Sequence, residues 1–562
     1  MKQLIECVPN FSEGRDPQVI KQITDVIETV KGVKLLDVDP GQATNRTVVT
    51  FVGEPGPVIE AAFLAIQKAS ELIDMRSHTG EHPRMGATDV CPLIPIANIS
   101  MEETAEWARR LGERVGNELN LPVYLYEAAA SSPERKNLAV IRAGEYEGLP
   151  EKLKNTEWKP DFGEARFNAK SGATVIGARD FLIAFNVNLN TTSVRRANSV
   201  AFDVREIGRV VNDLSGKPMK DADGEPVRQP GELKGVKGIG WFIEEYGIAQ
   251  ISMNITDVQA TPLHIAFEAC CRSADRRGMR VSGSELVGLV PLSVMLNAGK
   301  YFLAKQQRSV GVSDKELIKI AVKSMGLDEL APFDPARKII EYNLEASNPA
   351  NAKKLVSMDL ISFADETASE SVAPGGGSIS AYVGALGISL ATMVANISSH
   401  KRGWDDRWAE FSEAAERGQK LKAALLYAVD EDTAAFNAVM DAFALPKSTP
   451  EEKTARKAAI QTATIGATEI PLKAMRLAFK SFDLIREMVE KGNPNSITDG
   501  AVGALCARAA VRGCALNVKV NAVGIDDKVY VEKVLGEANE LSAKADALEA
   551  EIIKVVQEKM GV

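Results

Sequence analysis

The chain contains 562 residues, enough for about three to five folding units. Hydrophobic residues make up 45% and charged residues 25% of it, which is ordinary for a globular protein and excludes a largely disordered or fibrous chain. The 67 basic and 76 acidic residues give a net charge of −9, which argues against a uniformly basic nucleic-acid-binding protein but leaves room for a local basic channel.

In the first half of the chain, strand-like and helix-like segments alternate, which is typical of an α/β fold. Apolar or β-branched runs bounded by Gly or Pro predict strands, and apolar residues at helical spacing predict helices. In chain order, we expect strands at 34–39 and 46–52, a helix at 57–73, strands at 122–126, 181–187 and 249–255, and a helix at 262–276. The polar segment 212–231 predicts a surface loop.

After about residue 330 the pattern changes. Two Pro-containing breaks predict a linker at 331–352, and the Ala-rich segment 353–562 has few strand-like runs. The predicted fold class is α/β, with two subdomains (1–180 and 181–330) that have ferredoxin-like sheets and helices, followed by an all-α helical bundle domain.

The segment 371–399 contains no charged residue, and its apolar part, 381–397, is nearly long enough to cross a membrane. It is rich in Gly, Ala, Ser and Thr, and it follows a Pro-Gly-Gly-Gly turn. We therefore expect a small-residue helix buried in a bundle, and no membrane span.

The six cysteines form no C-x-x-C pair, so the sequence predicts neither a disulfide framework nor a structural zinc site. The opening MKQLIEC lacks the apolar core of a signal peptide. Both features favour a cytoplasmic protein.

The segment RSHTGEHPR, at 76–84, places two of the four histidines, His78 and His82, four residues apart. On a helix this spacing could hold zinc, but Gly80 and Pro83 break the helix. The alternatives are a surface histidine without a role and a rigid loop that presents a general base. The second gains weight from Asp37, Asp39, Asn45 and Arg46 at nearby strand ends, because a carboxylate beside a histidine raises its basicity.

Two further loops of the first half are candidate ligand contacts. The segment 7–14, which contains Asn10, is an apolar strand that ends in a polar loop. The segment 172–179 combines Gly172 and Gly177, which permit close backbone approach, with the cation Arg179. It could bind a flat ligand or carboxylates, or it could be only a tight connection between subdomains.

In the helical half, Asp432 shares one predicted helix face with Leu425, Val429, Phe436 and Val439. A carboxyl in an apolar stripe would have a raised pKa and could act as a general acid. The same helix carries Asp430 and Asp441 on other faces. The alternative is that Asp432 only caps a helix or complements its dipole.

Gly375 and Gly376 precede the small-residue helix, and their free amides could bind an anion, although a simple turn explains them equally well. Asn517 and Asn521 lie four apart and could hydrogen-bond an amide-rich heterocycle or each other.

Several separated motifs carry a family resemblance. In the first half, VPNFSEG, LLDVD, TNRTVVTFVG, LIDMRSHTGEHPRMGATDVCP, GATVIGARDFLIAFNVNL and SELVGLVP resemble the glutamate formimidoyltransferases. In the second half, SVAPGGGSISA, DEDTAAFNAVMDAFALPKSTPEEK and ALNVKVN resemble the formimidoyltetrahydrofolate cyclodeaminases. The order of the two halves is that of the bifunctional formimidoyltransferase-cyclodeaminase family, and the resemblance covers essentially the whole chain.

The resemblance implies that N5 of tetrahydrofolate attacks the formimino carbon of N-formimino-L-glutamate in a first step. The family's catalytic histidine corresponds to His82, which Asp39, and with less support Asp37, would orient. The family's folate-binding loop corresponds to Gly163–Gly172, and Arg179 would pair with substrate carboxylates.

In the implied second step, N10 closes on the amidine carbon and ammonia leaves, which gives 5,10-methenyltetrahydrofolate. The family's catalytic aspartate falls in the DEDTAAF motif, and the helix-face argument selects Asp432 over Asp430. The resemblance implies histidine degradation and one-carbon metabolism as the setting, tetrahydrofolate, in some cases polyglutamylated, as co-substrate, no metal and a homo-oligomer.

The segment 207–231 looks longer than in animal members of the family, and we expect this surface loop to leave the chemistry intact. Two alternatives remain: the second half could be a methenyltetrahydrofolate cyclohydrolase, or the chain could be a folate-binding scaffold without catalysis.

Overall fold

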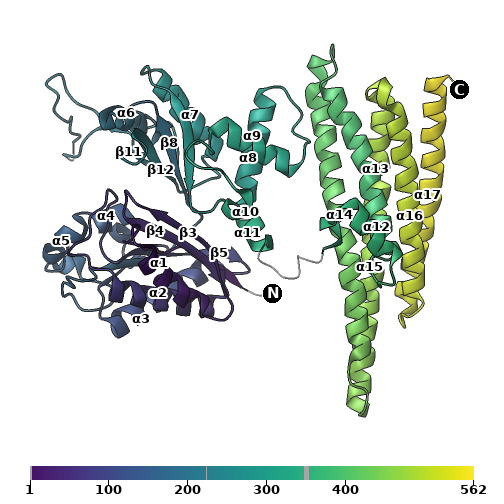
Figure 1. The fold of residues 1–562 in the computed structure, drawn as a ribbon, viewed down its shortest axis with the longest axis horizontal. Helices are drawn as coiled ribbons and strands as arrows, with labels where there is room; N and C mark the ends of the chain where they lie inside the picture. Colours follow the sequence, from purple (N-terminus) through teal and green to yellow (C-terminus); the bar gives the residue numbers. More distant parts are fainter. Residues whose placement is uncertain (1–2, 223, 347–353, 562) are drawn as a thin grey trace. The chain divides into compact units, whose positions relative to one another are not determined.

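The computed structural model describes residues 3–222, 224–346 and 354–561, which form two compact units (Figure 1). The first unit comprises Met1–Ala298 and Ala321–Ser347, and the second comprises Gly299–Ile320 and Asn348–Val562. The predicted fold class is confirmed: the first half contains mixed sheets with helices, and the C-terminal region is almost entirely helical. The segment 331–352, predicted as a linker, contains two short helices, and its residues 347–352 lie outside the described residues.

A seven-stranded sheet forms the first half of the first unit. Its path runs β1-β4-β2-β5-β7-β6, with β3 paired to β4, and β5, β6 and β7 are parallel while the other pairs are antiparallel. The strands are β1 (Leu4–Cys7), β2 (Asn10–Phe11), β3 (Val33–Gly41), β4 (Arg46–Gly53), β5 (Thr88–Ala97), β6 (Val123–Glu127) and β7 (Thr174–Ala178).

Three helices cover one face of this sheet and bury its apolar side chains: α1 (Pro17–Glu28), α2 (Pro55–Leu72) and α3 (Met101–Leu119). Local signals fix where they begin. Proline occupies the first turn of α1 and α2, where its missing N–H costs nothing, and Ser100 with Glu103 forms a capping box at α3. Two short helices, α4 (Leu138–Arg142) and α5 (Glu145–Lys152), follow β6.

A four-stranded antiparallel sheet, in the order β11-β12-β8-β13, forms the rest of the first unit. Its strands are β8 (Ile183–Leu189), β11 (Val236–Ile243), β12 (Ile248–Ile255) and β13 (Val281–Val287), with α6 (Val194–Val204) and α7 (Leu263–Asp275) against it. The segment predicted as a surface loop contains the small ladder of β9 (Arg209–Val210) and β10 (Arg228–Gln229), and the Leu214 side chain within it is fully exposed.

Four further helices follow β13: α8 (Leu292–Lys305), α9 (Asp314–Met325), α10 (Pro335–Lys338) and α11 (Ile340–Ala346). The second unit is a bundle of long helices, preceded by α12 (Leu360–Ala368): α13 (Gly376–Ser399), α14 (Trp408–Ala444), α15 (Pro450–Lys491), α16 (Ile497–Ala522) and α17 (Lys528–Met560) (Figure 1).

The uncharged segment predicted as a buried helix is α13, which packs against α14 and α16. Small residues let the helices approach closely, since a Cβ at Gly387 would lie 2.9 Å from the Gly503 carbonyl oxygen. By length and composition alone, Gly376–Ser399 and Pro494–Ala522 could each cross a membrane, and 61% and 44% of their most apolar windows are buried within the fold.

Candidate functional site

A cavity of about 430 Å³ lies between one face of the seven-stranded sheet and one face of the four-stranded sheet, inside the first unit. Because successive side chains of a strand point to opposite faces, the residues of β4 and β5 that reach it alternate along each strand. The first sheet contributes Glu6, Val8, Asn10, Arg46, Val48, Thr50, Val90, Pro92 and Ile94, and the second contributes Ala184, Asn186, Trp241, Ile243, Gln250, Ser252, Asn254, Glu285 and Val287. The volume is within the usual range for small-molecule sites.

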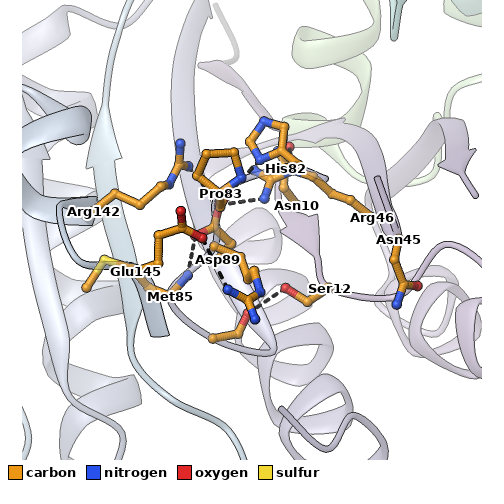
Figure 2. Close-up of polar contacts among 12 residues, drawn as sticks. Asn10, Ser12, Asn45, Arg46, His82, Pro83, Met85, Asp89, Arg142 and Glu145 are labelled. Atoms are coloured by element: carbon orange, nitrogen blue, oxygen red, sulfur yellow. Dashed lines mark hydrogen bonds and ion pairs between the residues drawn. The ribbon is translucent and has the colours of Figure 1, made fainter. Parts of the chain in front are cut away.

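A buried charged network adjoins this cavity and centres on Asp89, in β5 (Figure 2). Asp89 Oδ2 accepts hydrogen bonds from Arg46 Nη1 at 2.5 Å and from Arg142 Nη2 at 2.7 Å, and Oδ1 accepts one from the Met85 backbone N–H at 2.9 Å. Burial alone would raise the pKa of this carboxyl, but Arg142 and Arg46 hold it down, to about 2. Two guanidinium groups against one carboxylate leave a net positive charge, which suits an anionic ligand.

His82 lies in the loop between α2 and β5 and lines the cavity. Its Nδ1 is 2.7 Å from the Pro83 carbonyl oxygen. A carbonyl can only accept, so Nδ1 carries the proton and Nε2 of the neutral ring keeps a free lone pair. Burial, together with the positive charges of Arg46 and Arg142, lowers the pKa of His82 to about 3. The imidazole is therefore neutral at pH 7, in the form that can accept a proton.

Close packing fixes the loop that carries His82. A Cβ at Gly80 would lie only 2.2 Å from the Thr44 carbonyl oxygen, so glycine is needed at this approach. Asn45 Nδ2 donates to the Thr79 carbonyl at 2.9 Å, which ties the loop to the turn before β4. The close contact at Gly80 and the hydrogen bond from Asn45 together hold this loop against the turn before β4.

The predicted pairing of Asp39 with His82 is not what the structure has. Asp39 lines the same cavity, but its Oδ2 accepts hydrogen bonds from the Gly288 backbone N–H at 2.8 Å and from Lys338 Nζ at 3.2 Å. The carboxylate whose charge acts on His82 is that of Asp89. Asp37 is half-buried, and its Oδ2 has no partner among the described residues; partial burial raises its pKa to about 6.

The predicted ligand contacts divide into two groups. Asn10, Arg46 and Arg179 line the cavity, and Asn10 Oδ1 accepts a hydrogen bond from Arg46 Nε at 2.9 Å. Gly163 and Gly172 do not belong to the described lining. Both have positive φ and pack against backbone, with a Cβ 2.2 Å from the Leu121 and Met85 carbonyl oxygens respectively, so their role in the fold is close packing.

Gly177, in β7, makes room for a cavity residue. A Cβ at this position would lie 2.4 Å from the Tyr126 ring, and Tyr126 lines both the first cavity and a second one of about 500 Å³. His82, Arg142 and Arg179 also belong to both linings. The two cavities are therefore adjacent and share these side chains.

Sequence reasoning missed three charged groups of this site: Glu6, Asp89 and Arg142. Glu6 and Asp89 are carboxylates within strands, flanked by apolar residues, and Glu6 is only 4% exposed. A carboxylate at an inward position of a buried strand is an available signal, because such groups are rarely buried without a partner. Arg142 lies on α4, and nothing in its local sequence marks it.

In the second unit, Asp432 lies on α14 beside the first turn of α13. Its Oδ2 accepts a hydrogen bond from Ser378 Oγ at 2.9 Å, and the carboxylate also accepts one from the Ser378 backbone N–H. A Cβ at Gly377 would lie 2.2 Å from Asp432 Oδ1, so only glycine admits this carboxylate. Burial raises the pKa of Asp432 against the effect of these hydrogen bonds, as a general acid requires.

The prediction of an apolar helix face around Asp432 is only partly correct. Leu425 and Val429 are fully buried, but Phe436 is 38% exposed. The reason is length: α14 has 37 residues and α13 has 24, so α14 continues beyond the start of α13 (Figure 1). Asp432 thus lies at the edge of the buried core.

The structure distinguishes Asp430 from Asp432. Asp430 Oδ1 accepts a hydrogen bond from the Leu355 backbone N–H at 2.8 Å and so anchors the start of this unit. Asn517 lies near Gly376, whose Cβ would be 3.2 Å from Asn517 Nδ2, whereas Asn521 donates to the Ala467 carbonyl. The start of α13 therefore gathers Asp432, Asn517 and the glycine turn.

The described residues contain no group of three or more His, Cys, Asp or Glu side chains arranged to hold a metal ion. His78 is engaged elsewhere: its Nε2 lies 2.9 Å from the Asn45 carbonyl oxygen, and its Nδ1 accepts from Arg84 Nε at 3.3 Å.

Two chemically different sites on two compact units are the mark of a bifunctional enzyme. Residues 4–179 match the family described as the formiminotransferase domain, N-terminal subdomain, residues 184–345 match the formiminotransferase domain, and residues 359–540 match formiminotransferase-cyclodeaminase. Over 533 residues, which cover 95% of each protein, the chain is 44% identical to a formimidoyltransferase-cyclodeaminase of Rattus norvegicus. The chain belongs to the formimidoyltransferase-cyclodeaminase family.

Each half also matches a separate protein. A glutamate formimidoyltransferase of Streptococcus pyogenes is 40% identical over 303 residues, which cover 54% of this chain and 94% of that protein. A methenyltetrahydrofolate cyclohydrolase of Methylorubrum extorquens is 41% identical over 199 residues, which cover 35% of this chain and 96% of that protein.

Proposed function

We propose that the chain transfers the formimino group from N-formimino-L-glutamate to N5 of tetrahydrofolate and then converts 5-formimidoyltetrahydrofolate to 5,10-methenyltetrahydrofolate and ammonia. The observation that carries the proposal is the 44% identity over 95% of the chain to a formimidoyltransferase-cyclodeaminase. The two sites support it, because each contains the proton-transfer group that one step needs.

In the first step, His82 Nε2 takes the proton of N5 as N5 attacks the formimino carbon. The tetrahedral intermediate then collapses, and His82 returns the proton to the departing nitrogen of glutamate, so no net proton is consumed. A pKa near 3 makes the imidazole by itself a weak base. Burial is the larger cause of this low pKa, and the positive charges of Arg46 and Arg142 add to it. Substrate carboxylates that pair with these two guanidinium groups offset the second cause and so raise the basicity of the ring.

In the second step, N10 attacks the carbon of the protonated amidinium group (N5–CH=NH2+) and loses its proton. The terminal nitrogen, which already carries two hydrogens, takes up a third and leaves as ammonia, with the methenyl cation as the other product. Burial raises the pKa of Asp432 and so favours its protonated form, which donates to the leaving nitrogen and recovers a proton from N10. The free amides at the start of α13 and the Asn517 amide lie beside Asp432 and would hold polar groups of the folate.

The direct test mixes N-formimino-L-glutamate and tetrahydrofolate with the full chain and follows glutamate, ammonia and the methenyl absorbance together. The proposal predicts all three products in equal amounts. Glutamate without ammonia would exclude the second activity, and no glutamate would exclude the first.

The match to a methenyltetrahydrofolate cyclohydrolase favours a second candidate for the helical unit. A cyclohydrolase adds water to 5,10-methenyltetrahydrofolate, so the full chain supplied with that compound would lose the methenyl absorbance without any source of ammonia. The cyclodeaminase proposal predicts ammonia from supplied 5-formimidoyltetrahydrofolate and a stable methenyl product. Cytoplasmic location and homo-oligomer formation stay predictions, which fractionation and light scattering would test.

A further inference from the structure

Glu6 is a buried carboxyl that the proposed chemistry does not use. It lies in β1, between Val52 of β4 and Ile94 of β5, and it lines the cavity of about 430 Å³ while being only 4% exposed. Among the described residues no side chain or backbone group donates a hydrogen bond to it, and the single charge that acts on it is that of Arg179. Burying a carboxyl without a hydrogen-bond donor costs free energy. Because Glu6 lines a cavity, we expect a ligand in that cavity to supply the donors.

The position of Glu6 along the strand narrows the choice of ligand group. Glu6 and Asn10 both line the cavity and are four residues apart along the chain. Asn10, Arg46 and His82 lie together where the transfer must take place (Figure 2). The Glu6 carboxylate would repel the carboxylates of glutamate, so we expect its ligand group on the folate.

Tetrahydrofolate offers a matching group in the same ring system as its reacting nitrogen. The 2-amino group and N3–H of its pyrimidine ring are two adjacent donors, and one carboxylate can accept both in a bidentate arrangement. We propose that Glu6 binds the 2-amino and N3–H edge of the reduced pterin and so selects tetrahydrofolate. This inference rests on the proposed transferase function and adds a recognition residue to it.

Because binding needs an ionised Glu6, the proposal predicts that the affinity for tetrahydrofolate depends on pH. Burial, opposed only in part by Arg179, raises the pKa of Glu6 to about 7. The other titratable groups that face it or its neighbours are Cys7, Cys91 and Tyr126 on the first sheet and Glu245, Tyr246 and Glu285 across the cavity. Only the ionised carboxylate accepts two hydrogen bonds, so tetrahydrofolate should bind more weakly as the pH falls through 7.

The test is steady-state glutamate release by the full chain and by Glu6→Gln, with tetrahydrofolate varied at pH 6 and pH 8. For the wild type, kcat/KM for tetrahydrofolate should be about tenfold lower at pH 6, because the ionised fraction of a group with a pKa of 7 falls by that factor. Glu6→Gln should lower kcat/KM at pH 8 about tenfold or more, lose the pH dependence and keep kcat within about twofold. Glu113→Gln, an exposed carboxylate on α3, is the matched control and should keep the wild-type profile.

A second comparison replaces tetrahydrofolate with its 2-desamino-2-methyl analogue. The wild type should lose affinity for the analogue, and Glu6→Gln should lose little further, because the interacting pair is already broken. An unchanged kcat/KM in Glu6→Gln, or a loss confined to kcat, would overturn the inference while the transferase function stands. Absence of glutamate release from the wild type would instead contradict the proposed function itself.

Discussion

At the residue scale, the state of His82 is the decisive feature of the first site. The hydrogen bond from Nδ1 to the Pro83 carbonyl leaves Nε2 free, and burial, together with the surrounding cations, keeps the ring neutral. A neutral imidazole that is fixed in one tautomer needs no rearrangement before it accepts a proton. The account therefore gives this side chain the base role.

Replacement of His82 by Gln should keep the fold and lower kcat/KM for formimidoyl transfer by about 10²–10⁴-fold, the usual contribution of a general base. Glutamate release is the measurement, and ammonia release from supplied 5-formimidoyltetrahydrofolate should be unchanged. His400→Gln, at an exposed histidine of the second unit, is the control. Wild-type transfer by His82→Gln would support a different base.

Asp89 should be important for stability as well as for His82. Asp89→Asn leaves the buried Arg46 and Arg142 without their counter-ion, and we expect a loss of about 3–5 kcal/mol in the free energy of unfolding, measured with denaturant at pH 7. Asp74→Asn, at an exposed pair with Arg76, should change stability little. Equal stability of Asp89→Asn and the wild type would contradict the assigned network.

The same carboxyl predicts part of the acid unfolding profile. The pKa of Asp89 in the folded chain, about 2, is below its usual value of 3.8, so its stabilising contribution is complete above pH 4 and is lost as the pH falls toward 2. The contribution amounts to about 2 kcal/mol, and the Asn variant should lack this portion of the pH dependence.

The sequence could identify His82, Arg46 and Asn10 because each lies in a short motif with a chemical rationale. It could not identify the partner of His82. Asp39 and Asp89 are both carboxylates of strands near the loop, and only the three-dimensional packing directs Asp39 toward Gly288 and Lys338. Glu6 shows the same limit, since its role depends on the sheet that faces it.

At the element scale, the start of α13 controls the second site. Gly377→Ala would place a methyl group 2.2 Å from Asp432 Oδ1, so the carboxylate must move and the hydrogen bond from Ser378 must lengthen or break. We expect ammonia release from 5-formimidoyltetrahydrofolate to fall by an order of magnitude or more, about 1.4 kcal/mol.

The matched control for this variant is Gly536→Ala on α17, where an added Cβ meets nothing within 4 Å. Because alanine is the better helix former, Gly536→Ala should be slightly more stable and fully active. Full ammonia release by Gly377→Ala would contradict the assignment of Asp432.

The long helices and most strands could be predicted because their apolar periodicity is strong. The strand β5 could not be predicted so readily, because Pro92 and Pro95 lie inside it and proline normally excludes a central strand. The sheet accommodates them: β5 pairs with β1 and β7, and the Pro92 carbonyl still accepts a hydrogen bond from Val8.

At the scale of the whole molecule, the order of the two halves was readable from composition, because an Ala-rich helical pattern replaces the α/β pattern after about residue 330. The exact boundaries of the two compact units could not be read from composition. The segment Gly299–Ile320 belongs to the helical unit and Ala321–Ser347 to the α/β unit, an exchange of segments that only tertiary contacts reveal.

The central claim is that two independent centres transfer protons, one an imidazole and the other a carboxyl. It is tested most directly by the full-length Asp432→Asn variant with N-formimino-L-glutamate and tetrahydrofolate, with glutamate and ammonia measured in the same reaction. The account predicts glutamate at the wild-type rate, little ammonia and accumulation of 5-formimidoyltetrahydrofolate. A variant in which both products fall together, or in which ammonia appears at the wild-type rate, would contradict it.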